Sequence, residues 1–333
     1  MGRIAGRFTR VEPRRWVRRL VLGLLSDLPR KNCWTIAERA GEATPDGMQH
    51  LLGRAKRDAD QVRDDVRGYM VEHLHADQAL LVVDETGDVK KGTVGVQRQY
   101  TGTAGRIENA QVAVYLVYAS RRGHATVDQE LYVPRSWTSD PCRCRAAGLA
   151  EETSFATKPE PAARMIARFL DAGHHASWVA GDEVSGGNPK LRTALEERGT
   201  GYVLAVACSH EVTTGGGKFR ADTLAKKVPK RGWQKLSAGA GAQGHRFYDW
   251  AVIDLTGPRP GSRQLLIRRD RCTGELAYYR CYSPTPAPLP SWCESLDRDD
   301  GWRSSSKLAR AWPHWTNTRS AATHRPNGKG LTA

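Results

Sequence analysis

Two aspartates that each follow a short apolar segment are the residues with the clearest chemical potential. Asp84 ends "ALLVVD" and Asp182 ends "WVAGD". If both segments are strands of one α/β sheet, residues just past their carboxyl ends meet at one edge. Two close carboxylates repel unless a cation lies between them, and Mg2+ or Mn2+ suits such hard ligands and supports phosphoryl transfer. The alternative is that each aspartate only caps a helix or forms a turn.

Basic residues follow both aspartates, and the chain as a whole is basic. Lys and Arg total 51 against 36 Asp and Glu, which gives a net charge of +15. Phosphate backbones bind such donors, so the charge predicts a nucleic-acid partner. The alternative is a genome-wide bias toward arginine. The candidate phosphate contacts are Lys90, Lys91, Arg98, Arg106 and Lys190.

Composition argues against several other classes of protein. No run of about 18 apolar residues is present, so no membrane-spanning helix is expected. The basic N-terminus lacks the apolar core of a secretory signal. The seven cysteines are odd in number and lack zinc-site spacing, which predicts reduced thiols in the cytoplasm. The glycine run "TTGGGKFR" lacks the spacing of a phosphate-binding P-loop.

The chain divides into segments of different periodicity. Residues 1–77 have the pattern of amphipathic helices with a helix-turn-helix character, which either contact DNA or only pack on the next domain. Residues 78–208 alternate strands with helices, which predicts a mixed α/β sheet. Residues 209–270 have the pattern of a β-rich insertion, and residues 271–285 that of a last core strand. Residues 286–333 have no regular period and are expected to be irregular.

Three long stretches carry a resemblance to a known family. They are "VVDETGDVKKGTVGVQRQYTGTAGRIENAQVAVYLVY", "LYVPRSW" and "WVAGDEVSGGNPKLRTALEERGTGYVLAVA". In this order they resemble bacterial insertion-sequence transposases of the DDE-superfamily endonuclease type, over about residues 2–285. The resemblance implies a ribonuclease-H-like mixed sheet with flanking helices, an N-terminal helical region and a β-rich insertion.

The same resemblance implies a function and a site. Asp84 and Asp182 match the first two catalytic acids, which would hold Mg2+ or Mn2+ for DNA cleavage and strand transfer. The partners would be double-stranded DNA, namely the terminal inverted repeats of the element and the target DNA. A homodimer on DNA, a place in the cytoplasm at the nucleoid and the absence of any membrane partner agree with it. Ser185 departs from the family, which often has an aromatic residue at that position.

The third catalytic acid of the family is not identifiable. Family members carry a glutamate in a helical motif resembling R-W-x-(I/V)-E-E after the insertion, and no such motif occurs here. The acids in the corresponding region match no family motif and are Glu294, Asp297, Asp299 and Asp300. We therefore expect a transposase that is inactive in this form, or alternatively a non-catalytic DNA-binding remnant.

A shifted reading frame would account for the missing acid. When the third base of each codon is read with the first two bases of the next, residues 314–318 encode Leu-Asp-x-(His/Tyr). Residues 291–303 permit a segment that ends in Arg-Trp, and both products resemble the missing family segment in the right order. We hypothesise a frameshift near residues 284–291.

The gene sequence across residues 280–333 tests this hypothesis. An alternate frame that encodes a helix with the R-W-x-x-E pattern is the expected result. Stop codons in that frame, or the absence of such a helix, would exclude the frameshift.

Overall fold

The structure is a computed structural model that describes most of the chain up to the start of the C-terminal segment. The described residues are 2–55, 58–90, 94–101, 104–150, 153–241, 244–293 and 296. Several residues singled out above therefore lie outside the described part, namely Lys91, Glu294, Asp297, Asp299 and Asp300.

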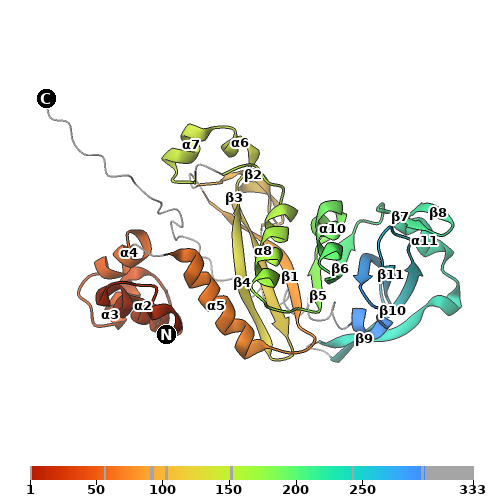
Figure 1. Cartoon of the computed structure of the whole chain (residues 1–333), viewed down its shortest axis with the longest axis horizontal. Coiled ribbons are helices and arrows are strands. Elements are labelled where there is room, and N and C mark those ends of the chain that lie inside the picture. The colour runs from red at the N-terminus through yellow and green to blue at the C-terminus, as the bar shows by residue number, and fades with distance from the viewer. Residues whose placement is uncertain are drawn as a thin grey trace.

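Helices form the N-terminal part of the chain. They are α1 (Gly2–Ala5), α2 (Val11–Leu24), α3 (Cys33–Arg39), α4 (Asp46–Gly53) and α5 (Ala59–Leu74). Asn32 caps α3 because its side chain accepts hydrogen bonds from the backbone N–H groups of Trp34 and Thr35. The first four helices pack together at one end of the molecule, and α5 runs from them along the sheet (Figure 1).

The central part combines strands and helices in a mixed α/β arrangement, with four consecutive strands first and helices before and after β5. Its strands are β1 (Leu80–Val89), β2 (Gln97–Thr101), β3 (Arg106–Ser120), β4 (Gly123–Tyr132), β5 (Trp178–Gly181) and β6 (Gly201–Val206). Its helices are α6 (Arg135–Thr138), α7 (Pro141–Ala146), α8 (Pro159–Asp171), α9 (Glu183–Gly187) and α10 (Pro189–Glu197). Helix α8 buries one face because its apolar residues recur at helical spacing, with Met165, Ile166 and Phe169 fully buried.

The β-rich part continues the same sheet. Its elements are β7 (Glu211–Thr214), β8 (Gly217–Arg220), α11 (Ala221–Lys227), the short 3-10 helix η1 (Lys230–Gly232), β9 (Gln234–Gly241), β10 (Gly244–Asp254), β11 (Ser262–Asp270) and β12 (Leu276–Ser283). Strands β7 and β8 form a separate hairpin. Strand β12 pairs antiparallel with β6, so the segment predicted as the last core strand joins the main sheet.

The main sheet has ten strands and mixes parallel with antiparallel pairs. Its order is β2-β3-β1-β5-β6-β12-β11-β10-β9, with β4 paired to β3. Strands β1, β5 and β6 are mutually parallel, whereas β3 runs antiparallel to both β1 and β4. Helices flank this sheet, which agrees with the ribonuclease-H-like fold predicted from the sequence (Figure 1).

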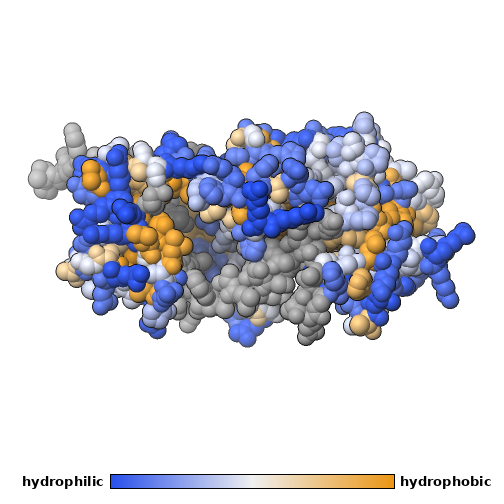
Figure 2. All heavy atoms as spheres, turned by 90° about the horizontal axis from the view of Figure 1, so that it is seen from below, coloured by the Kyte–Doolittle hydropathy of each residue, from blue (hydrophilic) through white to orange (hydrophobic). Residues whose placement is uncertain are grey.

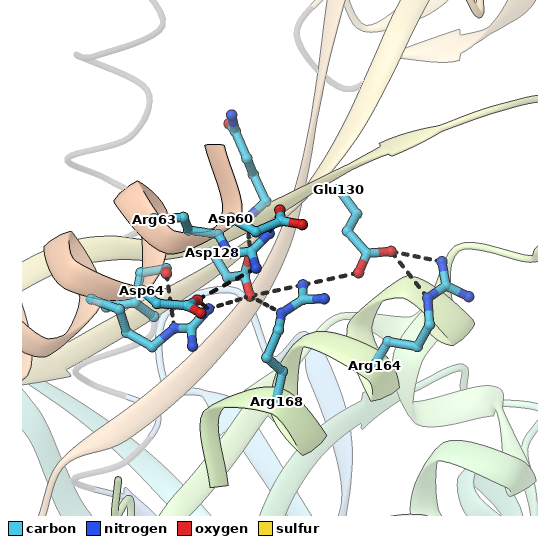
Figure 3. A network of polar contacts seen from close by, with 10 residues as sticks. Asp60, Arg63, Asp64, Asp128, Glu130, Arg164 and Arg168 are labelled. Atoms are coloured by element: carbon cyan, nitrogen blue, oxygen red, sulfur yellow. Dashed lines mark hydrogen bonds and ion pairs between the residues drawn. The ribbon is translucent and has the colours of Figure 1, made fainter. Parts of the chain in front are cut away.

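A buried ionic network ties α5 to the sheet. The carboxylate of Asp128 on β4 is fully buried and accepts from Arg67 Nη2 of α5 at 3.0 Å and from Arg168 Nε of α8 at 2.9 Å. Arg67 is only 1% exposed, so the charges are paired where water could not solvate them. Arg168 and Arg164 also bind Glu130, which extends the network along β4 (Figure 3). The N-terminal helices are thus fixed to the core through α5.

Hydrophilic residues cover most of one face of the molecule, with two apolar areas, over the N-terminal helices and over the β-rich end (Figure 2). In the helical part, Val11, Leu22, Leu25 and Trp34 are more than half exposed. Arginines lie between the exposed apolar residues of α2, as its sequence "VEPRRWVRRLVLGL" requires.

The start of the segment expected to be irregular is ordered against the sheet. Residues 289–293 are helical, although their sequence has no helical period. Trp292 and Cys293 are 1% exposed, and the Trp292 ring lies 4.5 Å from the ring of Trp178 on β5. Apolar side chains at these positions fit the sheet surface, which the periodicity of so short a segment did not indicate.

Candidate functional site

Asp84 lies within β1 rather than at its end. The sequence predicts a strand that stops at this residue, but β1 continues through Val89 because β3 pairs with it from Leu80↔Ala119 to Val89↔Ala110. The parallel pairing with β5 ends earlier, at Val82↔Ala180. Asp84 therefore follows the end of the parallel ladder, which is the position that matters for convergence with β5.

The register of β1 and β5 brings the two aspartates together. Leu80 pairs with Trp178 and Val82 with Ala180, so the next position on the same face would place Asp84 opposite Asp182. Neighbouring strands are about 4.8 Å apart. Asp84 is 8% exposed, and both aspartates line one small pocket. The sequence-based expectation of convergence is met in the structure.

A tight turn holds Asp182 in place. Its Oδ1 accepts a hydrogen bond from the backbone N–H of Ser185 at 3.0 Å, so this aspartate caps the N-terminus of α9. The capping role considered from the sequence is therefore real and coexists with the place in the pocket. Gly186 lets α9 approach β6, because a Cβ at this residue would lie 1.9 Å from the carbonyl oxygen of Ala205.

A lysine that the sequence did not single out also lines the pocket. Lys158 Nζ forms an ion pair with Glu85 Oε2 at 2.6 Å, and Glu85 is the neighbour of Asp84 on the opposite face of β1. Lys158 directly precedes Pro159, the first residue of α8. Pro159 marks the start of a helix, but nothing in the local sequence shows that the lysine before it meets β1, so the sequence did not mark it as part of the site.

Ser185 closes the pocket from the side of α9. It is 4% exposed and lies against Gly181, where an added Cβ would come within 2.9 Å of the Ser185 Cβ. A small side chain therefore fits at this position, where the resemblance implies an aromatic residue.

The donor set fits a divalent ion only in part. Two carboxylates at one pocket are ligands that Mg2+ and Mn2+ accept, with water or phosphate completing the shell. Within the described residues, no group of three or more His, Cys, Asp or Glu side chains could hold a metal ion. Glu85 is a third carboxylate in the pocket lining, but it is paired with Lys158, so the described site offers Asp84 and Asp182 as the two candidate ligands.

The predicted phosphate contacts are distributed over two regions. Lys190 is exposed on α10 and lies close to the start of α8, since hydrogen bonds from Thr157 and then the charges of Lys190 and Arg164 lower the pKa of Glu160. Arg98 and Arg106 are exposed on the β2–β3 hairpin, where Arg106 pairs with Glu108 at 2.8 Å. Lys90 follows β1 and lies 3.9 Å from Asp88. Among the described residues of this set, Lys190 is thus the one that lies beside α8, the helix that begins directly after the pocket residue Lys158.

Comparison with known proteins agrees with this architecture. Residues 3–246 match the family described as DDE superfamily endonuclease. The chain belongs to this family. This chain is also 32% identical over 197 residues to a probable transposase for insertion sequence element IS701 from Microchaete diplosiphon. That match covers 58% of this chain and 49% of the relative, so the chain spans about half the length of the curated relative it matches.

Members of the superfamily generally use divalent metal ions, in agreement with paired carboxylates at a sheet edge. None of the helices in the described part of the chain has the length and apolarity that a bilayer crossing requires.

The close approach of α9 to β6 predicts the effect of two adjacent substitutions. Gly186→Ala is expected to destabilise the protein by about 1–3 kcal/mol, because its Cβ would overlap a backbone carbonyl. Gly187→Ala is the matched control: nothing lies within 4 Å of its added Cβ, so it should be neutral or stabilising by up to about 1 kcal/mol. Urea unfolding of the three proteins measures this, and equal stability of both variants would show that α9 does not depend on this contact.

Proposed function

We propose that the chain is the transposase of an insertion sequence, built for metal-dependent DNA cleavage and strand transfer. The observation that carries the proposal is the parallel register that puts Asp84 and Asp182 at one pocket. The IS701 relative is a probable transposase, which supports the same activity. The partners proposed are the terminal inverted repeats of the element and the target DNA, with a homodimer assembled on them at the nucleoid.

In this proposal Asp84 and Asp182 are the first and second catalytic acids. Both would hold Mg2+ or Mn2+, which when bound activates a water or hydroxyl group and stabilises the leaving oxygen of a phosphodiester. The main task of the chain's own residues is to fix these carboxylates: β3 pairs with β1 on one side, and the backbone N–H of Ser185 orients Asp182. Lys158 adds a positive charge at the same pocket.

The basic residues are proposed as contacts to DNA phosphates. Lys190 lies on α10, which contacts α8 beside the pocket residue Lys158, whereas Arg98 and Arg106 extend the basic surface along the β2–β3 hairpin. Lys90 and Lys91 follow β1. The proposed domains are residues 1–77 for DNA binding, 78–208 with 271–285 for the catalytic core, 209–270 for the insertion and 286–333 for an out-of-frame tail.

The chain in this form is proposed to be inactive in strand transfer. Within the described residues no group of three or more His, Cys, Asp or Glu side chains could hold a metal ion, and Glu85, the third carboxylate of the pocket lining, is paired with Lys158. The face that carries Leu80, Val82 and Asp84 also carries Trp178, on which Trp292 packs. The segment after β12 thus reaches the correct face of the sheet for a third acid, which agrees with loss of a catalytic helix at this point. The alternative is a non-catalytic DNA-binding remnant that competes at the element ends.

Cleavage and binding assays on the DNA that flanks the gene test the proposal. In Mg2+ we expect binding without cleavage, and an affinity that falls about a thousandfold between about 50 and about 200 mM salt if about six phosphates are contacted. Cleavage that Asp84→Ala abolishes would contradict the proposed inactivity and exclude the remnant. Binding that is absent or insensitive to salt would contradict DNA as the partner.

A further inference from the structure

Three basic side chains from separate elements gather beside α9. Arg192 lies on α10, His210 follows β6, and Arg280 lies on β12 opposite Leu204 of β6. All three are half-buried. Arg192 donates a hydrogen bond from Nη1 to the carbonyl oxygen of Gly186, which fixes one member of the group against α9. We refer to Arg192, His210 and Arg280 as the basic cluster.

The members of the basic cluster are close enough to influence one another. Burial, then Arg192 and Arg280, lower the pKa of His210 to about 4. Burial, then Arg280, lowers the pKa of Arg192. These shifts agree with the register that sets Arg280 opposite Leu204 of β6, the strand that leads to His210, and with the hydrogen bond of Arg192 to Gly186, which lies against β6. Positive charges so close repel each other, which lowers the stability of the folded state.

Acidic side chains near the basic cluster are committed to other partners. Glu196 accepts from Arg263 at 2.6 Å and from the Tyr202 hydroxyl at 2.8 Å. Glu211 pairs with Lys218 at 2.5 Å.

Two nitrogens of the basic cluster are also unsatisfied. His210 Nε2 and Arg280 Nε are shielded from solvent and hydrogen-bond to none of the described groups. A buried donor without a partner costs free energy, which a bound anion would recover.

The basic cluster lies at the same sheet edge as the two aspartates. Arg280 pairs with Leu204, which pairs with Gly181, the residue before Asp182. Two strand spacings, about 10 Å, separate β12 from β5 in the sheet. By strand alternation Arg280 shares the face of Tyr278 and Tyr282, on the side that α9 and α10 cover. An anion held here would therefore lie beside the Asp182 turn and on the other face from Asp84.

We propose that the basic cluster is a phosphate-binding subsite that holds one backbone phosphate of DNA. The identity of DNA as the source of that phosphate rests on the proposed function, whereas binding of a phosphate group does not. Two guanidinium groups and an imidazole, whose described acidic neighbours Glu196 and Glu211 are paired with Arg263 and Lys218, match the charge and the acceptor oxygens of a phosphate. The subsite would fix the DNA relative to α9 and so relative to Asp182.

A substitution of Arg280 distinguishes this subsite from a structural arginine. Arg280→Gln should weaken binding of a 30-base-pair duplex about tenfold and reduce the slope of log affinity against log salt by about one. Its melting temperature should equal or exceed that of the wild type, because an uncompensated charge is removed. Arg198→Gln is the control, since it removes one charge from a residue that follows α10 and pairs with Asp171. A loss of affinity equal in both variants, or none in Arg280→Gln, would overturn the proposal.

Titration with inorganic phosphate tests the subsite without DNA. The His210 ring, observed by NMR and assigned with His210→Gln, should show its pKa rise by about one to three units when phosphate binds in the wild type, and not in Arg280→Gln. The other groups that face this ring are Arg192, Arg280 and Glu211, and the Glu211 charge stays paired with Lys218 in both proteins.

The duplex-binding and phosphate-titration experiments test the proposed function and the subsite separately. A phosphate effect without an Arg280 effect on duplex binding would refute DNA as the source. No phosphate effect would refute the subsite. Absence of DNA cleavage bears on neither result.

Discussion

The parallel register of β1 and β5 is the constraint on which the rest of this protein depends. It places Val82 opposite Ala180 and so brings Asp84 and Asp182, almost a hundred residues apart in the chain, to one pocket. Two carboxylates so close repel each other, so hydrogen bonds or positive charge must offset that repulsion. Within the described chain, the backbone N–H of Ser185 on α9 hydrogen-bonds to Asp182, and the ammonium group of Lys158 lies at the same pocket. A divalent ion between the carboxylates, as the family implies, would offset the repulsion further.

The surrounding elements preserve this register. Strand β3 pairs with β1 over its whole length, so β1 cannot slip without exposing the alternate set of side chains. Helix α9 is pressed on β6 through Gly186, and Arg192 ties α10 to the same turn. The buried carboxylate of Asp128 joins α5 and α8 to β4. The proposed DNA-binding helices are therefore connected to the core by paired buried charge rather than by apolar packing alone.

Sequence reasoning identified the parts of the site that depend on strand ends. "ALLVVD" and "WVAGD" predict two buried strands with acids beyond them, and the convergence follows from the sheet. It missed the length of β1, because the polar residues after Asp84 are held in the ladder by β3. It also missed Lys158 and the basic cluster, since chain connectivity alone does not reveal which side chains meet across β6 and β12. The order of Trp292 against Trp178 depends on a tertiary contact as well.

Asp84 and Asp182 are proposed to act together as ligands of one divalent ion. Titration of the protein with Mn2+, followed by electron paramagnetic resonance, tests it without any requirement for catalysis. We expect the wild type to bind one Mn2+, and both Asp84→Asn and Asp182→Asn to lose that binding, with no further loss in the double variant. Asp88→Asn, on the same strand but paired near Lys90, should bind as the wild type does. Equal Mn2+ binding by the wild type and the Asp84 and Asp182 variants would contradict the claim.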